Sequence, residues 1–284
     1  MKLLLGTYPP TSKVYITDTV KTLLENSFVN FNSTIPIINS DGRLVGKISK
    51  VKLANWFLEK IFREEIIENT LYTPIDNTDL KIEQAKPVEV FDFTPETIVN
   101  LLHSKGDYEI YITHDGKLIG EFSLSSLLYI SSWKSNVGIR IEELFVKELV
   151  SVEHEASITD ILNNLSAPNE PELIGVTYAK NLVGLIMMED LLQYLYNVTE
   201  DGGVVNKIKG SKPWVIAFPD FSFVYMDESV SKALRALKRT RDKKFLIVQN
   251  RREETLGYIS VKDALLKVED EITLKLSTQR IKER

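Results

Sequence analysis

The sequence contains no cysteine among its 284 residues, so disulfides, thiol nucleophiles and thiolate metal ligands are all excluded. It has three histidines, His103, His114 and His154, and no two of them stand at a metal-ligand spacing. No apolar run approaches the roughly 20 residues of a membrane-spanning helix, since the longest covers residues 182–188. The first six residues hold too few apolar positions for the core of a signal peptide. These absences predict a soluble, cytoplasmic protein with no membrane contact and no metal site.

The charge balance is mildly acidic, with 40 Asp and Glu against 35 Lys and Arg and a net charge of −5. A negative net charge gives no global electrostatic reason to bind nucleic acid. The hydrophobic fraction of 43% and the charged fraction of 26% are ordinary for a globular protein. At roughly 150 residues per domain, the length predicts about two domains.

A strand–turn–strand pattern occurs four times along the chain. The first two copies place Asp-Gly between apolar runs, at residues 41–42 and 115–116, which is a strong hairpin signal. Each copy has one glycine in its second strand, and these signature glycines are Gly46, Gly120, Gly184 and Gly257. The first and third are 138 residues apart, and the second and fourth are 137 apart. The chain is therefore predicted to be a duplicated pair of repeats.

An amphipathic helix is predicted before each of the four hairpins. Apolar residues recur there at i, i+3 and i+4, which places them on one helix face. A hydroxyl residue that can cap the helix start precedes each first apolar position; these residues are Thr19, Thr97, Ser157 and Ser229. Another apolar segment follows each hairpin. Each repeat thus reads strand, helix, strand, strand, helix in about 50 residues, too few to bury both helices and a sheet alone.

The end of the repeat resembles the CBS domain, named for cystathionine β-synthase, whose pattern is a glycine, an apolar strand, Ser or Thr, and Asp three residues later; repeat four has this pattern in full. The resemblance covers nearly the whole chain and implies an α/β fold of four β-α-β-β-α repeats, at residues 8–70, 86–135, 145–200 and 213–270. The superperiod leads us to expect that repeats one and two pair as one module over residues 1–135. Repeats three and four would pair over residues 136–284, which end in a polar tail. No catalytic domain is left over, so we expect neither an enzyme nor a catalytic residue.

In CBS domains the Asp after the third strand binds the ribose hydroxyls of an adenosine compound, because a carboxylate accepts strong hydrogen bonds from hydroxyls. Repeat four matches this pattern fully, with Ser260 and Asp263, whereas repeat three keeps Asp190 but lacks the hydroxyl. Repeats one and two have Lys52 and Ser126 where the Asp belongs. The resemblance therefore implies a ligand site in the cleft of the C-terminal pair and weak or no binding in the N-terminal pair.

Ser260 and Asp263 also have a purely structural interpretation. Ser-x-x-Asp at a helix start forms a capping box, which stabilises the helix whether or not a ligand binds. Asp190 has no Ser three residues before it, so capping explains that carboxylate less well. Capping and ligand binding are compatible, and the sequence leaves both open.

A basic run holds seven Lys and Arg between residues 232 and 244, against a single Asp. In the CBS family a basic residue just before the second strand can reach the ligand phosphates, and Lys244 and Arg241 match that position. One alternative is a solvated helix face, the commonest role of a charge run. The other is a local surface for nucleic-acid phosphates.

Together these features predict a regulatory protein that senses an adenine nucleotide (AMP, ADP or ATP) or S-adenosylmethionine. The ligand would bind reversibly, with no tightly held cofactor, and would change an interaction with an unidentified protein partner. A homodimer is compatible with the sequence. Two alternatives stay open: a single-stranded nucleic-acid-binding module, and a structural scaffold that binds no ligand and serves only assembly.

Overall fold

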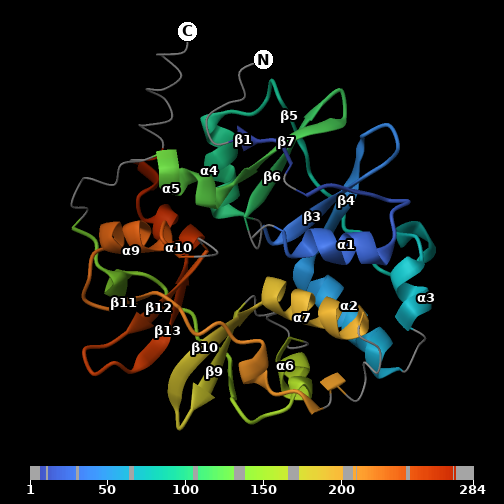
Figure 1. Cartoon of the computed structure of the whole chain (residues 1–284). Coiled ribbons are helices and arrows are strands. Elements are labelled where there is room, and N and C mark those ends of the chain that lie inside the picture. Colours follow the sequence, from blue (N-terminus) through green and yellow to red (C-terminus); the bar gives the residue numbers. More distant parts are fainter. Residues whose placement is uncertain are drawn as a thin grey trace. The chain divides into compact units, whose positions relative to one another are not determined.

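The structure is a computed structural model, and it describes residues 7–10, 12–29, 32–63, 67–104, 108–130, 138–165, 173–200, 207–208, 210–240, 244–270 and 272. In these ranges it contains four small sheets, one for each expected repeat (Figure 1). None of the helices in the described ranges combines the length and the apolar character needed to cross a membrane.

Repeats one and three have the same order of elements. In each, a short first strand runs parallel to the second strand, which pairs antiparallel with the third. Repeat one consists of β2 (Val14–Tyr15), α1 (Val20–Ser27), β3 (Thr34–Ile38), β4 (Leu44–Ser49) and α2 (Lys50–Phe62), and α3 (Ile67–Tyr72) follows it. Repeat three consists of β8 (Ser151–Glu153), α6 (Ile158–Leu165), β9 (Leu173–Tyr178), β10 (Asn181–Met187) and α7 (Met188–Glu200).

Repeats two and four follow the same plan. Repeat two consists of β5 (Val88–Glu89), α4 (Pro95–His103), β6 (Glu109–His114), β7 (Lys117–Ser123), a 3-10 turn (Leu124–Ser126) and α5 (Leu127–Ile130). Repeat four consists of β11 (Phe223–Tyr225), α9 (Val230–Leu237), β12 (Phe245–Gln249), β13 (Thr255–Ser260) and α10 (Val261–Leu266). In all four repeats the first helix makes the crossover that two parallel strands require.

The predicted helix faces are confirmed in α1, α4 and α9. Their apolar positions are buried, namely Val20, Leu23, Leu24, Ile98, Leu101, Leu102, Val230, Ala233, Leu234 and Leu237. Thr19 and Ser229 cap their helices as expected. The start of α4 differs from the prediction, because Thr94 is its N-cap and Thr97 lies inside its first turn. Pro95 explains the difference, since proline favours the first helical position, where its missing N–H has no partner to lose.

The Asp-Gly hairpin of repeat two is anchored by a carboxylate from the first strand. Asp115 and Gly116 both have positive φ, at 52° and 76°, as a tight hairpin turn requires. Glu89 accepts hydrogen bonds from the Thr113 hydroxyl at 2.9 Å and from the backbone N–H groups of Gly116 and Asp115 at 3.1 and 3.2 Å. These donors, the Thr113 hydroxyl foremost, lower the pKa of Glu89 below its ordinary value of 4.5.

Acidification should therefore loosen the tip of this hairpin. A carboxylate whose pKa is lowered in the folded protein contributes stability above its ordinary pKa, and this contribution is lost as the pH falls through the lower, folded value. We expect the amide resonances of Asp115 and Gly116 to titrate below pH 4.5 in the wild-type protein. Glu89→Gln should abolish this titration, and its persistence in the variant would assign it to another carboxylate.

The chain forms two compact units, which divide the repeats differently from the prediction. The odd unit, residues 11–85 and 149–220, contains repeats one and three. The even unit, residues 1–10, 86–148 and 221–284, contains repeats two and four. The expected division at residue 135, with neighbouring repeats sharing a core, is thus corrected.

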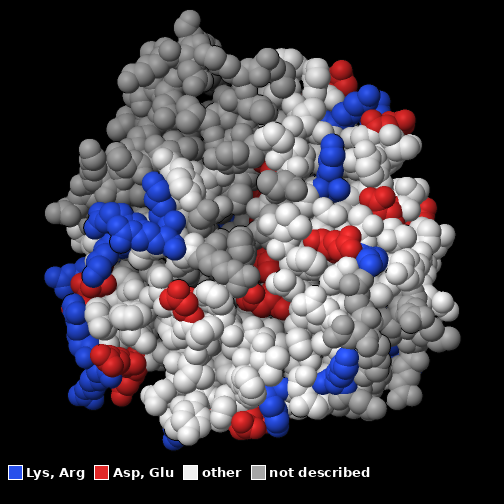
Figure 2. All heavy atoms as spheres, in the orientation of Figure 1, with Lys and Arg blue, Asp and Glu red and all other residues white. Residues whose placement is uncertain are grey.

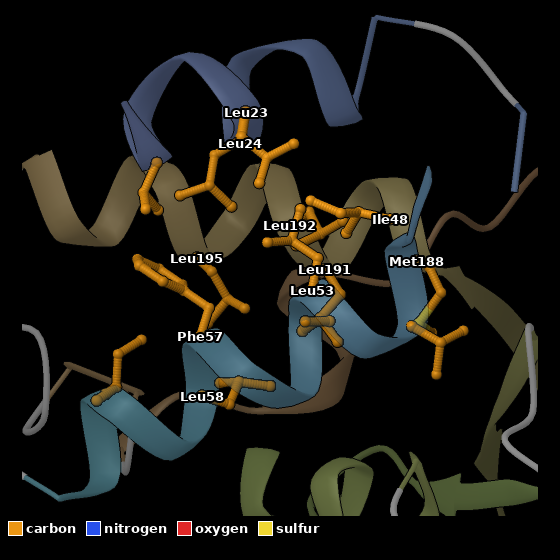
Figure 3. Close-up of a cluster of buried hydrophobic side chains, with 14 of the residues drawn as sticks. Leu23, Leu24, Ile48, Leu53, Phe57, Leu58, Met188, Leu191, Leu192 and Leu195 are labelled. Atoms are coloured by element: carbon orange, nitrogen blue, oxygen red, sulfur yellow. The ribbon is translucent and has the colours of Figure 1, made fainter. Parts of the chain in front are cut away.

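The packing of the helices gives the reason for this division. In the odd unit, α1 and α2 of repeat one pack against α7 of repeat three. Figure 3 shows their side chains in one cluster, in which Leu191, Leu192 and Leu195 of α7 lie between the α1 and α2 side chains. Leu23 and Leu24 of α1 are above them in this view, and Leu53 and Phe57 of α2 are below. In the even unit, α10 packs against α4 and α9 against α5. The repeats that share a core are those related by the superperiod, so duplicated copies bury matching helix faces against each other.

A short edge segment before the first strand of each repeat pairs with the third strand of a different repeat. β1 (Thr7–Tyr8), before repeat one, pairs antiparallel with β7 of repeat two. The other pairings join Glu83 to Lys47, Lys147 to Tyr258, and Phe218 to Leu185. Repeats one and two therefore exchange edge segments, as do repeats three and four, and each segment covers a strand edge that would otherwise be open.

Candidate functional site

Each repeat places one side chain three residues after the end of its third strand, where the chain turns into its next helical segment. These residues are Lys52 in repeat one, Ser126 in repeat two, Asp190 in repeat three and Asp263 in repeat four. The third strand fixes the position of this turn, because the next helical segment begins directly after the strand ends. The structure therefore sets the four residues at equivalent places of the fold, and they differ in chemistry.

Asp263 forms the capping box that its spacing from Ser260 predicted. Its Oδ2 accepts hydrogen bonds from the Ser260 hydroxyl at 2.6 Å and the Ser260 N–H at 3.0 Å. The Ser260 hydroxyl accepts one in return from the Asp263 N–H at 3.2 Å. Both bonds to the carboxylate use Oδ2, and Oδ1 accepts none from the residues that the structure describes. The structural interpretation is confirmed, and one carboxylate oxygen is left for another donor.

A lysine that the sequence did not single out completes the surroundings of Asp263. The Nζ of Lys147 lies 3.1 Å from Asp263 Oδ2, with the two side chains 32% and 20% exposed. Lys147 belongs to the edge segment of repeat three, and its backbone N–H and C=O both bond to Tyr258 at 2.9 Å. No local pattern could reveal this pair, because Lys147 reaches repeat four only through the exchange of edge segments.

Asp190 has a weaker local anchor than Asp263. Its Oδ2 accepts a hydrogen bond from the Met187 N–H at 3.4 Å, and Met187 has no hydroxyl with which to complete a capping box. The preceding residue, Glu189, is buried and pairs with Lys50 of repeat one at 2.8 Å. The side chain of Asp190 is partly exposed. Repeat three therefore keeps the carboxylate but not the capping box.

Repeats one and two offer no carboxylate at this position. Lys52 forms an ion pair with Glu83, which comes from the edge segment on repeat one just as Lys147 does on repeat four. Ser126 is buried. An ammonium group accepts no hydrogen bond, so Lys52 cannot replace Asp as an acceptor for ribose hydroxyls. The predicted difference between the N-terminal and C-terminal repeats has this chemical basis and awaits a binding measurement.

The two basic residues predicted to contact phosphates have different outcomes. Lys244 lies directly before β12, as expected, but it is buried, and its carbonyl accepts a hydrogen bond from the Val261 N–H at 2.6 Å. Its position beside the start of α10 brings it near the Asp263 region, and a phosphate contact stays a prediction. Arg241 lies outside the described residues, as does Lys243.

The exposed face of α9 carries the rest of the basic run. Lys232 and Arg235 are exposed on α9, and the exposed Lys238 and Arg239 follow directly after its end. Figure 2 shows Lys and Arg side chains gathered over this part of the molecule. Lys232 pairs with Glu228, and Lys238 lies 4.8 Å from the centre of the exposed Tyr129 ring. Within its bounds α9 contains two Lys or Arg, and the corresponding helices α1, α4 and α6 together contain one. This cationic face is specific to repeat four.

Within the described ranges, no group of three or more His, Asp and Glu side chains could hold a metal ion. The clearest charge pair outside the helix starts is Arg251 with Asp227 at 2.9 Å, on the hairpin side of repeat four. The Arg251 guanidinium lowers the pKa of Asp227, and Asp227 raises that of Arg251. Both groups are exposed and lie at a turn, which fits a surface ion pair.

Comparisons with known proteins place this architecture. No family model matches the sequence, and no curated protein is similar to it. The structure is similar to that of protein MJ1225 from Methanocaldococcus jannaschii, which has been proposed as an archaeal homologue of γ-AMPK. The TM-score is 0.76 and the sequence identity is 17%, and the match covers 90% of this chain and 95% of MJ1225. It is also similar to a conserved protein from Pyrococcus horikoshii, with a TM-score of 0.56 and 18% identity over 95% of this chain and all of that one.

A half-length match is the CBS domain protein PAE2072 from Pyrobaculum aerophilum, whose structure was solved with AMP. It has a TM-score of 0.38 and 25% identity, and the match covers 49% of this chain and 99% of that one. The likeness to MJ1225 extends over nine-tenths of this chain and shows a shared fold. The chain therefore has the CBS-repeat fold, in four copies, as the sequence resemblance predicted.

Proposed function

We propose that the protein is a regulatory sensor of an adenine nucleotide or a related adenosyl compound, with Asp263 as the acceptor for the ribose hydroxyls. The Asp263 carboxylate carries the proposal, because it stands at the ribose-binding position of the family and is partly exposed. Its Oδ1 accepts no hydrogen bond from the described residues. A carboxylate oxygen has two lone pairs, so Oδ1 can receive ribose hydroxyls while Oδ2 keeps capping α10.

Ser260 takes a supporting role in this proposal. Its side chain is fully buried, and its hydroxyl both donates to and accepts from Asp263. We therefore assign it to the positioning of the carboxylate, not to contact with the ligand. Asp190 is proposed as a second ribose acceptor, in repeat three, and Lys244 with Arg241 as phosphate contacts.

Binding would act on the conformation of the protein. A ligand shifts an equilibrium between two arrangements only by its difference in affinity for them. The shifted arrangement would then be recognised by a protein partner, and no residue is assigned a catalytic role. Calorimetric titration of the purified chain with AMP, ADP, ATP and S-adenosylmethionine tests the first step directly.

Asp263→Asn is expected to weaken nucleotide binding by about 1–3 kcal/mol, the range for hydrogen bonds to a charged group. Asparagine keeps a side-chain oxygen for the cap of α10, so the loss reflects the missing negative charge more than the loss of the helix. The measurement is the dissociation constant of the tightest ligand found in the titration, compared between the variant and the wild-type protein.

Asp160→Asn is a matched control for this change. Asp160 forms the same capping box, accepting from the Ser157 N–H and hydroxyl at 2.9 Å each, but it lies at the start of α6 and not at the ribose position. It should leave the affinity unchanged. The proposed function is wrong if the wild-type protein binds none of the four compounds, or if the two Asn variants bind alike.

The cationic face of α9 favours a second candidate function, the binding of single-stranded nucleic acid. Its four exposed cations and the nearby Tyr129 combine charge for phosphates with a ring on which a base can stack. An oligonucleotide included in the same titration distinguishes the candidates. Binding that weakens steeply with salt and is lost in Arg235→Ala with Arg239→Ala would support this role.

A further inference from the structure

The ion pair between Lys147 and Asp263 has a counterpart of reversed charge elsewhere in the chain. On repeat four, the edge segment provides the cation and the helix start the carboxylate. On repeat one, the edge segment provides the carboxylate of Glu83, and the helix start provides the ammonium of Lys52. The backbone pairings are equivalent, since Lys147 pairs with Tyr258 and Glu83 pairs with Lys47. Tyr258 and Lys47 are the residues that directly follow the signature glycines of their repeats. Two repeats thus fasten their edge segments by the same contact with exchanged charges.

Lys147 is held firmly in this position. Its backbone makes two hydrogen bonds to Tyr258, and its Nζ lies 5.9 Å from the centre of the Tyr258 ring. The neighbouring Val146 packs against the core of the even unit. The backbone of Lys147 is therefore fixed beside repeat four, and its side chain is within reach of Asp263.

We infer that Lys147 is a built-in competitor for the Asp263 carboxylate: its ammonium at Oδ2 weakens Oδ1 as an acceptor, so a ribose ligand binds Oδ1 with full strength only when the ion pair is released. The inference rests on the proposed function and adds its regulation. The ammonium draws negative charge toward Oδ2 and covers one side of the carboxylate, so the carboxylate is a poorer acceptor for a neutral hydroxyl. Loss of the ion pair on binding also loosens Lys147, from which the chain continues into β8, the first strand of repeat three.

Adenosine is the probe that isolates this effect, because it has ribose hydroxyls and no phosphate that Lys147 could attract. We expect Lys147→Met to bind adenosine about threefold more tightly than the wild-type protein at low salt, the factor that a partly exposed ion pair is worth. Methionine keeps the unbranched stem beside Tyr258, and Lys147→Arg, which keeps the charge, should bind like the wild type. Glu83→Gln breaks the charge-reversed pair on repeat one and should leave adenosine affinity unchanged.

Salt gives a second signature. Added salt screens the ion pair, so the wild-type affinity for this uncharged ligand should rise between 50 and 500 mM NaCl, by about twofold. The Lys147→Met affinity should stay constant over the same range. Most polar contacts to a ligand weaken or stay constant as salt is added. An adenosine affinity that rises with salt only in proteins with a cation at position 147 would therefore identify that cation as the competitor.

The outcomes separate this inference from the proposed function. If the wild-type protein binds adenosine and Lys147→Met binds it equally or more weakly, the competition is refuted while the ligand site stands. If neither protein binds any adenosine compound, both ideas fail. Hydrogen exchange at the amides of residues 147 and 258, about threefold faster in Lys147→Met, checks that the edge segment is loosened but the variant remains folded.

Discussion

Glu189→Leu is expected to lower the free energy of unfolding of the protein by about 3–5 kcal/mol, the cost of leaving one partner of a buried ion pair behind. The Oε1 of Glu189 lies 2.8 Å from the Nζ of Lys50, and the two side chains are only 6% and 1% exposed. The pair joins the start of α7 to the start of α2, inside the odd unit. Without Glu189 the ammonium of Lys50 stays buried and loses the carboxylate that lies 2.8 Å from it.

The double variant Lys50→Met with Glu189→Leu should recover most of this loss, because apolar side chains of similar size replace a buried pair at little or no cost. Glu59→Gln is the control, since Glu59 pairs with Arg63 on the surface and both side chains are about two-thirds exposed. It should change stability by less than about 0.5 kcal/mol. Urea denaturation of the four proteins measures these differences. A double variant as unstable as Glu189→Leu alone would show that the site depends on the charges for more than mutual neutralisation.

The local elements of the fold could be predicted from the sequence because their signals are local. The Asp-Gly hairpin at residues 115–116 and the apolar face of α9 depend on residues within one turn or one helix. The sharing of cores could not be predicted in the same way. All four repeats carry apolar helix faces of the same phase, so any two could pack together on pattern alone. The Lys50–Glu189 pair joins repeat one to repeat three, and because its members stand 139 residues apart, no local pattern predicts it.

In the candidate site, too, the local contacts could be predicted from the sequence and the contacts between distant residues could not. The capping box of Ser260 and Asp263 follows from a spacing of three residues, and it is present. The ion pair of Asp263 with Lys147 depends on an edge segment that crosses from one repeat to another, and no spacing announces it. For Lys244, the sequence predicts its place directly before β12. It does not predict its burial, because that depends on how β12 packs against the start of α10.

The signature glycines allow a sharper test of the edge segments, with Gly257 as the most sensitive position. Gly257 has φ of +146°, and a Cβ atom there would overlap the carbonyl oxygen of Lys147. Gly257→Ala therefore combines a backbone conformation that side chains rarely adopt with a steric clash against the edge segment. Each effect costs about 1–3 kcal/mol, and we expect a loss of stability of about 4 kcal/mol in total.

Two further glycines separate these contributions. Gly42 has φ of +78° with no atom within 4 Å of an added Cβ, so Gly42→Ala should show the conformational cost alone. An added Cβ at Gly46 would lie 2.5 Å from the Glu83 carbonyl oxygen, and no positive φ adds to this clash, so Gly46→Ala should show the steric cost alone. If the edge segments are held as described, the loss in Gly257→Ala approaches the sum of the other two, and hydrogen exchange at residue 147 accelerates only in that variant. A Gly257→Ala protein no less stable than Gly42→Ala would mean that the edge segment moves aside freely, and that Lys147 is not held beside Asp263.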